Sequence, residues 1–259
     1  RNLGLENVLT PEEEVFYRYL QPIRDGAGSV VCAGTSFIAR RDALQEIGYF
    51  VTDSVSEDYF TGIRLSAKGY ELAYLNEKLS AGLAAESIGA HIDQRLRWGR
   101  GTLQAFFIKS NPLTIPGLNF WQRLAHLEGL VHWLTCFPRV FFLFVPIICT
   151  FGHLNPIVTS LPETMYVVLP YYILLLTVFS WLNRRSRSIL LSDVYSIVQA
   201  IPVFITVIKV LLNPFGKGFK VTPKGLARDK FNYNWSLALP MTILLGATLI
   251  SFSISLLSF

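Results

Sequence analysis

The stretch Gln94-Arg95-Leu96-Arg97-Trp98 lies where a polar, charged part of the chain gives way to a strongly apolar part. We expect a helix over residues 89–108, and the spacing i, i+3, i+4 places Gln94, Arg97 and Trp98 on one of its faces, with Arg95 elsewhere. A guanidinium can hold phosphate oxygens and an indole can stack on a sugar ring, so this face is a candidate binding surface. An amphipathic helix with a buried Trp and a solvated Arg has the same spacing.

An acidic pair, Glu57-Asp58, precedes this stretch and follows Ser56. We expect Ser56 to cap a helix over residues 57–68 that ends at Gly69. A carboxylate in its first turn can accept the proton that a hydroxyl nucleophile loses as it attacks. A charged helix N-terminus accounts for the same residues without any catalysis.

The polar part of the chain also predicts strands. Residues 29–40 are rich in Val, Ile, Phe and Thr, and residues 71–75 form a second short run. A helix is expected from a capping sequence at residues 10–13 to about Leu20. Because strands and helices alternate, we predict that residues 1–110 form the back half of an α/β domain.

Composition divides the chain into this polar portion and a membrane portion. Hydrophobic residues make up 51% of the sequence and aromatic residues 14%. This is too apolar for an ordinary soluble domain and too charged for a bundle that lies wholly in the membrane. We expect residues 111–259 to contain spans near 130–152, 164–183 and 234–259.

Residues 186–212 have a different pattern. Polar side chains recur there at steps of three and four on an otherwise apolar helix, which predicts a helix lying in the membrane interface. A fourth span with a polar seam is the alternative. The polar positions are Ser188, Ser192, Ser196, Gln199, Thr206, Lys209 and Asn213.

The distribution of basic residues predicts the orientation. Residues 184–230 are rich in Lys and Arg, whereas the loop over residues 152–163 has neither. The positive-inside rule therefore places the basic stretch and the polar portion in the cytoplasm, provided that residues 186–212 do not cross.

A third candidate element is the loop over residues 213–230. Its sequence Phe219-Lys220-Val221-Thr222-Pro223-Lys224 lies between two glycines and offers apolar, hydroxyl and cationic groups that can close over a nucleotide. A basic linker on anionic lipid is the plainer interpretation. The cysteines Cys32, Cys136 and Cys149 have no metal or pairing spacing and are expected to be plain thiols. The first residue, Arg1, and the apolar end at Phe259 suggest a piece of a longer protein.

Several segments match the motifs of one known family. Gln94-x-x-Arg97-Trp98 matches Q-x-x-R-W, and Ser56-Glu57-Asp58 matches T-E-D with Ser in place of Thr. Residues 31–35 resemble F-F-C-G-S loosely, and residues 219–224 fit F-x-V-T-x-K. Over nearly its whole length the chain resembles the processive, membrane-integrated family 2 glycosyltransferases, most closely the bacterial cellulose synthases. The last match separates it from hyaluronan and chitin synthases.

The resemblance implies a role for each site residue. Asp58 is expected to be the general base on the acceptor 4-hydroxyl, with Glu57 beside it as a second catalytic residue. Trp98 is expected to form the acceptor platform, Gln94 and Arg97 to contact the donor diphosphate or the acceptor, and Cys32 to lie near the terminal sugar. The gating-loop residues expected over bound UDP are Phe219, Val221, Thr222 and Lys224.

The resemblance also implies the fold and the cofactor. Residues 1–110 correspond to the acceptor-side, C-terminal half of a GT-A-type α/β glycosyltransferase domain, followed by helical transmembrane segments and the interfacial helix. A divalent metal, Mg or Mn, is expected in the full-length protein. Its D-x-D ligands do not occur in this sequence, so we assign no metal ligand and expect this piece alone to be inactive.

The function implied is processive, inverting transfer of glucose from UDP-glucose to the non-reducing end of a growing β-glucan, cellulose first, with translocation across the membrane. The expected partners are UDP-glucose, the glucan, membrane lipid and a periplasmic or accessory synthase subunit, with no nucleic acid. The expected location is the inner (plasma) membrane, multi-pass, with the catalytic portion cytoplasmic. The alternatives are another β-glucan such as a 1,3-linked one, a non-catalytic channel or scaffold, and a non-processive lipid-sugar transferase.

Overall fold

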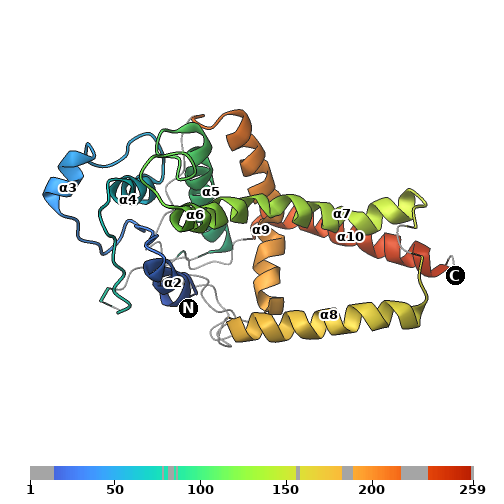
Figure 1. Cartoon of the computed structure of the whole chain (residues 1–259). Helices are drawn as coiled ribbons and strands as arrows, with labels where there is room; N and C mark the ends of the chain where they lie inside the picture. Colours follow the sequence, from blue (N-terminus) through green and yellow to red (C-terminus); the bar gives the residue numbers. More distant parts are fainter. Residues whose placement is uncertain are drawn as a thin grey trace. The chain divides into compact units, whose positions relative to one another are not determined.

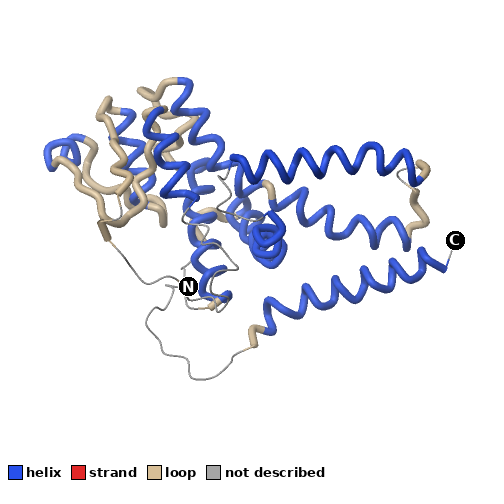
Figure 2. The backbone as a smooth tube through the Cα atoms, turned by 90° about the horizontal axis from the view of Figure 1, so that it is seen from below, coloured by secondary structure: helices blue, strands red, loops and turns tan. Residues whose placement is uncertain are grey.

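The computed structural model describes residues 15–77, 79–80, 85, 87–155, 158–182, 189–216 and 233–257. Within these ranges the chain is helical or irregular, and Figure 2 draws them without a strand. The described residues fall into two compact units. The first unit contains residues 15–135 and 202–216, and the second contains residues 136–201 and 233–257.

Short helices joined by long irregular segments build the first unit (Figure 1). Its core lies where α4 meets α6 and the turn after α5, and Phe60 and Leu130 are both fully buried there. This packing holds α4 against α6 and η2. The elements are η1 (Phe16–Leu20), α2 (Gln21–Gly26), α3 (Arg41–Glu46), α4 (Glu57–Ala67), α5 (Ile88–Leu103), η2 (Gln104–Phe107) and α6 (Phe120–Leu134).

The strands expected over residues 29–40 and 71–75 do not form. Side chains of α2 satisfy backbone groups that a sheet would have paired. The Gln21 amide donates to the Val31 carbonyl oxygen at 2.6 Å and accepts from the Val31 N–H at 3.1 Å. The N–H of Tyr74 donates to Asp25 Oδ1 at 2.9 Å. The predicted α/β class is therefore not confirmed by the described residues.

Two helix ends differ from the prediction. The first helix does not stop near Leu20 but continues as α2 to Gly26. Pro22 lies in the first turn of α2, after the π-helical turn η1, where a backbone N–H donor is not required. Helix α5 ends at Leu103, and the next residues form the 3₁₀ turn η2. Helix α4 ends close to the predicted stop, where Gly69 has a φ of +90°.

Apolar helices make up the second unit. Helices α7 (Cys136–Phe151) and α10 (Trp235–Leu257) run side by side (Figure 1). Ser251 of α10 donates to the carbonyl oxygen of Pro146 at 2.9 Å and contacts the Thr150 hydroxyl at 2.5 Å, so hydrogen bonds join two otherwise apolar surfaces. Helix α8 (Leu161–Leu182) has no buried residue.

Four helical stretches of the described residues are long and apolar enough to cross a membrane. They are Phe120–Phe151, Leu161–Leu182, Ser192–Leu212 and Trp235–Leu257. The third lies in α9 (Ile189–Leu212), for which an interfacial position is predicted, so length and composition alone also admit the fourth-span alternative. The C-terminal half of α9 belongs to the first unit and buries Val203, Val207 and Val210 there.

Candidate active site

Asp58 lies in the first turn of α4 and is half-buried. Its Oδ1 accepts a hydrogen bond from the Tyr59 N–H at 2.7 Å. Burial raises the pKa of the Asp58 carboxyl above its ordinary value and outweighs the lowering effect of this hydrogen bond. The neighbouring charges act in opposite directions on this pKa, since Glu57 raises it and Arg97 lowers it. Asp58 is thus a stronger proton acceptor than an exposed aspartate, and Arg97 is near enough to act on it.

Gly34 leaves the space in which the Asp58 carboxylate lies. Its φ is +70°, and a Cβ built on it would lie 2.5 Å from Asp58 Oδ2. Cys32 packs against the second turn of α4, where a Cβ on Gly62 would lie 3.3 Å from the Cys32 Cβ. Burial raises the pKa of the Cys32 thiol, and the charge of Asp58 adds to this effect. The structure therefore brings residues 32–34 and Asp58 together, with Cys32 as a protonated thiol.

Helix α5 carries the Q-x-x-R-W match and packs directly against the segment before α4. A side chain at Gly101 would collide with the Ser56 hydroxyl, so only glycine allows this approach. Ser56 makes no capping hydrogen bond, which corrects the predicted cap, because its hydroxyl faces α5 instead. On the other side of α5, Gly99 makes room for Trp133 of α6.

Trp98 is half-buried on α5, as are Gln94 and Arg97. The guanidinium carbon of Arg95 lies 5.3 Å from the centroid of the Trp98 ring, a cation–π distance. Arg95 was expected on a different face, and its long side chain instead reaches across one turn of the helix. The roles assigned to Gln94, Arg97 and Trp98 stay predictions, and Phe219, Val221, Thr222 and Lys224 lie outside the described residues.

Buried polar residues that the sequence analysis did not single out hold these elements in place. The Tyr59 hydroxyl is 3.2 Å from Nδ1 of His126, which joins α4 to α6, and burial raises the pKa of Tyr59. Arg24 of α2 donates to the Ala125 carbonyl oxygen at 2.9 Å and to Glu128 at 2.7 Å. The partners in each contact are far apart in sequence, so no local sequence pattern could predict these contacts.

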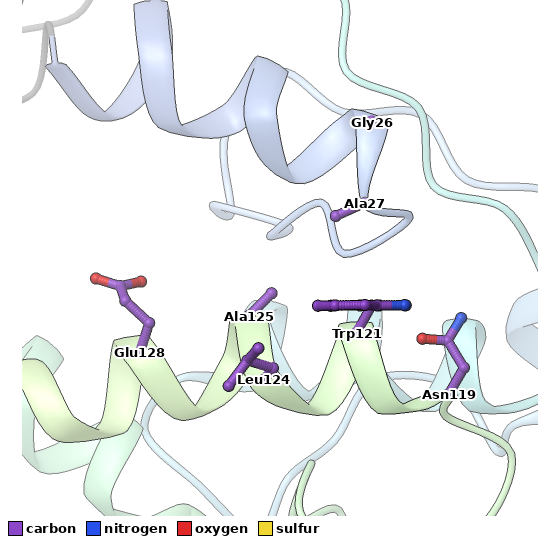
Figure 3. Close-up of a pocket in the computed structure, with 7 residues that line it drawn as sticks. All are labelled: Gly26, Ala27, Asn119, Trp121, Leu124, Ala125 and Glu128. Atoms are coloured by element: carbon purple, nitrogen blue, oxygen red, sulfur yellow. The ribbon is translucent and has the colours of Figure 1, made fainter. Parts of the chain in front are cut away.

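A groove of about 600 Å³ lies between the end of α2 and α6 (Figure 3). Figure 3 shows Trp121 and Ala125 on the side of α6 that faces Ala27. No residue predicted for the site lines this groove, so it is separate from the Asp58 region. The lining residues are Gly26, Ala27, Asn119, Trp121, Leu124, Ala125 and Glu128.

The described residues gather no three His, Cys, Asp or Glu side chains that could hold a metal ion. By themselves they do not form a site for the divalent metal expected in the full-length protein.

A half-buried carboxylate with a raised pKa, a guanidinium acting on it and apolar helices long enough to cross a bilayer are typical of a group-transfer enzyme at a membrane. The chain belongs to the family described as glycosyl transferase family group 2, whose model matches residues 20–216. This range includes every described residue of the candidate site.

Two curated relatives are similar over most of the chain. The cellulose synthase catalytic subunit (UDP-forming) of Pseudomonas fluorescens (strain SBW25) is 34% identical over 250 residues, which are 96% of this chain and 34% of that protein. The cellulose synthase 1 catalytic subunit (UDP-forming) of Komagataeibacter xylinus is 35% identical over 235 residues, 90% of this chain and 31% of that protein. The chain thus spans about a third of the length of these relatives.

Proposed function

We propose that this chain is the acceptor-side part of a processive, inverting β-glucan synthase that uses UDP-glucose and makes cellulose. The single observation that carries the proposal is the Asp58 carboxylate, which burial makes a better proton acceptor and which lies near Arg97. The family match and the names of the relatives support the substrate class.

In the proposed reaction the acceptor 4-hydroxyl oxygen attacks C1 of the donor glucose. The bond from C1 to the phosphate oxygen breaks, UDP leaves with the bonding electrons, and Asp58 takes the hydroxyl proton. A single direct displacement converts the α-linked donor into a β-linked product. Arg97 and Gln94 contact the donor diphosphate or the acceptor, where the Arg97 guanidinium can offset the charge that develops on the leaving group, and Trp98 supports the acceptor sugar.

The membrane arrangement belongs to the same proposal. Helices α7, α8 and α10 cross the inner (plasma) membrane, α9 lies in the interface, and the first unit is in the cytoplasm, where nucleotide sugars are available. The growing glucan then leaves through a path between the spans, with lipid and a periplasmic or accessory subunit as partners.

The general-base role is tested in the full-length protein with Asp58→Asn. Polymer formation should fall by about 10²–10⁴-fold, because a carboxamide cannot accept the proton, while UDP binding persists. The matched control is Asp53→Asn, on the same segment but exposed and paired only weakly with Arg64, at 3.5 Å. Synthesis by Asp58→Asn at the level of the control would overturn the proposal.

The platform role is tested with Trp98→Ala, which should stop elongation while leaving some hydrolysis of UDP-glucose. The control is Trp121→Ala, which removes an equally large ring from the α6 groove. Long chains from Trp98→Ala would rule out the platform. Methylation analysis of the wild-type product distinguishes 1,4-linked from 1,3-linked glucan.

A further inference from the structure

Gln104 is a buried polar residue at the junction of several segments of the first unit. It begins η2, directly after α5, and is 3% exposed. Its Oε1 accepts hydrogen bonds from the Ser54 hydroxyl at 2.8 Å and from the Val55 N–H at 3.0 Å. Its Nε2 donates to the carbonyl oxygen of Pro214 at 2.8 Å. One amide therefore joins the segment before α4, the end of α5 and the segment after α9.

The first of these segments leads directly into the general-base turn. The Ser54 hydroxyl accepts a hydrogen bond from the Ser56 N–H at 3.1 Å, and the Ser56 carbonyl oxygen accepts from the Phe60 N–H, the first backbone bond of α4. A continuous chain of hydrogen bonds thus runs from Gln104 to the turn that carries Asp58.

The other segment precedes the F-x-V-T-x-K match. Pro214 is held by Gln104, and the carbonyl oxygen of Gly216 accepts a hydrogen bond from Arg100 of α5. Two residues on the α5–η2 stretch therefore fix the backbone immediately before residues 217–232. The buried valines of α9 hold the same segment from its other end.

These bonds require an amide side chain of this length, because the amide oxygen accepts hydrogen bonds and the amide NH₂ group donates them. A glutamate would keep the contacts to Ser54 and Val55 but would direct a second oxygen at the Pro214 carbonyl. A methionine would fill the same space and make none of the three bonds, leaving the half-buried Val55 N–H and Pro214 carbonyl oxygen without this partner.

We infer that Gln104 is a positioning residue that sets the general-base turn and residues 213–216 in one fixed register against α5. This inference rests on the proposed synthase function, in which Asp58 and the segment that follows Gly216 act on the same substrates. Gln104 touches no substrate; it acts through Ser54 and Val55 on one side and through Pro214 on the other.

The test uses Gln104→Met in the full-length protein. The kcat for synthesis should fall by about 10²-fold, because a shift of about 1 Å in the base is enough for such a loss. The acid limb of the pH–rate profile should move to lower pH, since a loosened turn leaves Asp58 less buried. Its charged and titratable neighbours Glu57, Arg97 and Cys32 are unchanged in this variant.

The matched control is Gln122→Met. Gln122 of α6 also donates from its amide to a backbone carbonyl oxygen, that of Gly28 at 2.8 Å, but it lies away from the base turn. A merely structural role for Gln104 predicts the same outcome for both variants: less folded protein and an unmoved acid limb. That outcome would overturn the inference.

Hydrogen–deuterium exchange separates this inference from the proposed function, because it needs no activity. Gln104→Met should increase exchange in peptides covering residues 54–60 and 211–216, and Gln122→Met in neither. Unchanged exchange in both peptides of Gln104→Met would overturn the inference. Full synthesis by Asp58→Asn would instead overturn the proposed function.

Discussion

At the scale of single residues, the proposed chemistry depends on the environment of the Asp58 carboxylate. Residues 32–34 pack close to Asp58 and reduce the exposure of its carboxylate to solvent. This packing is possible because residue 34 is a glycine. A carboxyl group with a raised pKa can act as a general base only above that pKa. When the pH falls below the pKa, the group is protonated and can no longer accept a proton. Its two charged neighbours should therefore tune the pH at which the enzyme stops working.

Glu57→Gln should move the acid limb of kcat/KM to lower pH. The Glu57 charge raises the pKa of Asp58, so its removal lowers that pKa and keeps the base ionised further into acid. The measurement is the pH–rate profile of glucan synthesis. Glu46→Gln on α3 is the control, since Glu46 does not act on Asp58. An acid limb that stays in place after Glu57→Gln would mean that a different group limits the rate.

Motif and helical spacing predict Glu57, Asp58 and Arg97 as site residues, and their roles stay predictions. In the structure the charges of Glu57 and Arg97 both act on Asp58. The predicted Ser56 cap is wrong because the Ser56 hydroxyl contacts Gly101, which lies on another helix and leaves no local sequence signal. Gln104 was missed because its partners Ser54 and Pro214 are far from it along the chain, and a buried amide has no periodic signature.

At the scale of elements, helices were predictable and strands were not. Periodicity and end signals belong to the helix itself, so α4 and α8 lie close to their expected ranges and α5 begins close to its expected start. A strand depends on a neighbour, and β-propensity reports only that a segment suits a half-buried surface. Near Val31 and Tyr74, side chains of α2 took the backbone bonds that a neighbouring strand would have made.

The packing of α4 on α6 should dominate the stability of the first unit. Leu130→Ala removes a fully buried side chain next to Phe60 and should lower the free energy of unfolding by about 2–5 kcal/mol. Denaturant titration in detergent measures this. The neighbouring Val131 is 46% exposed, so Val131→Ala should change it by no more than about 0.5 kcal/mol. Equal losses from the two variants would contradict the core described here.

At the scale of the whole molecule, the charge of the loops decides which side of the membrane each segment occupies. The loop between α7 and α8 carries no Lys or Arg, whereas the basic residues gather between positions 184 and 230. The sequence therefore predicts that the basic stretch lies in the cytoplasm and that α9 lies in the membrane interface.

Site-specific labelling checks the orientation in a background in which Cys32, Cys136 and Cys149 are replaced by Ala. Asn155→Cys, in the loop after α7, should react with a membrane-impermeant maleimide in intact spheroplasts. Asn213→Cys, just after α9, should react only after permeabilisation. Both positions are exposed, so access to the reagent depends on the side of the membrane alone. The reverse pattern would mean that the polar unit faces outward.

The bare α-carbon of Gly34 also limits how such an enzyme can diverge. A Cβ at position 34 would lie 2.5 Å from Oδ2 of Asp58, and the φ of +70° disfavours any side chain there, so this glycine is constrained together with the carboxylate. A homologue with a substitution at Gly34 could keep both the Ser-Glu-Asp and the Q-x-x-R-W matches and still be inactive. Annotating distant homologues as active glycosyltransferases therefore requires checking this glycine along with the motifs around it.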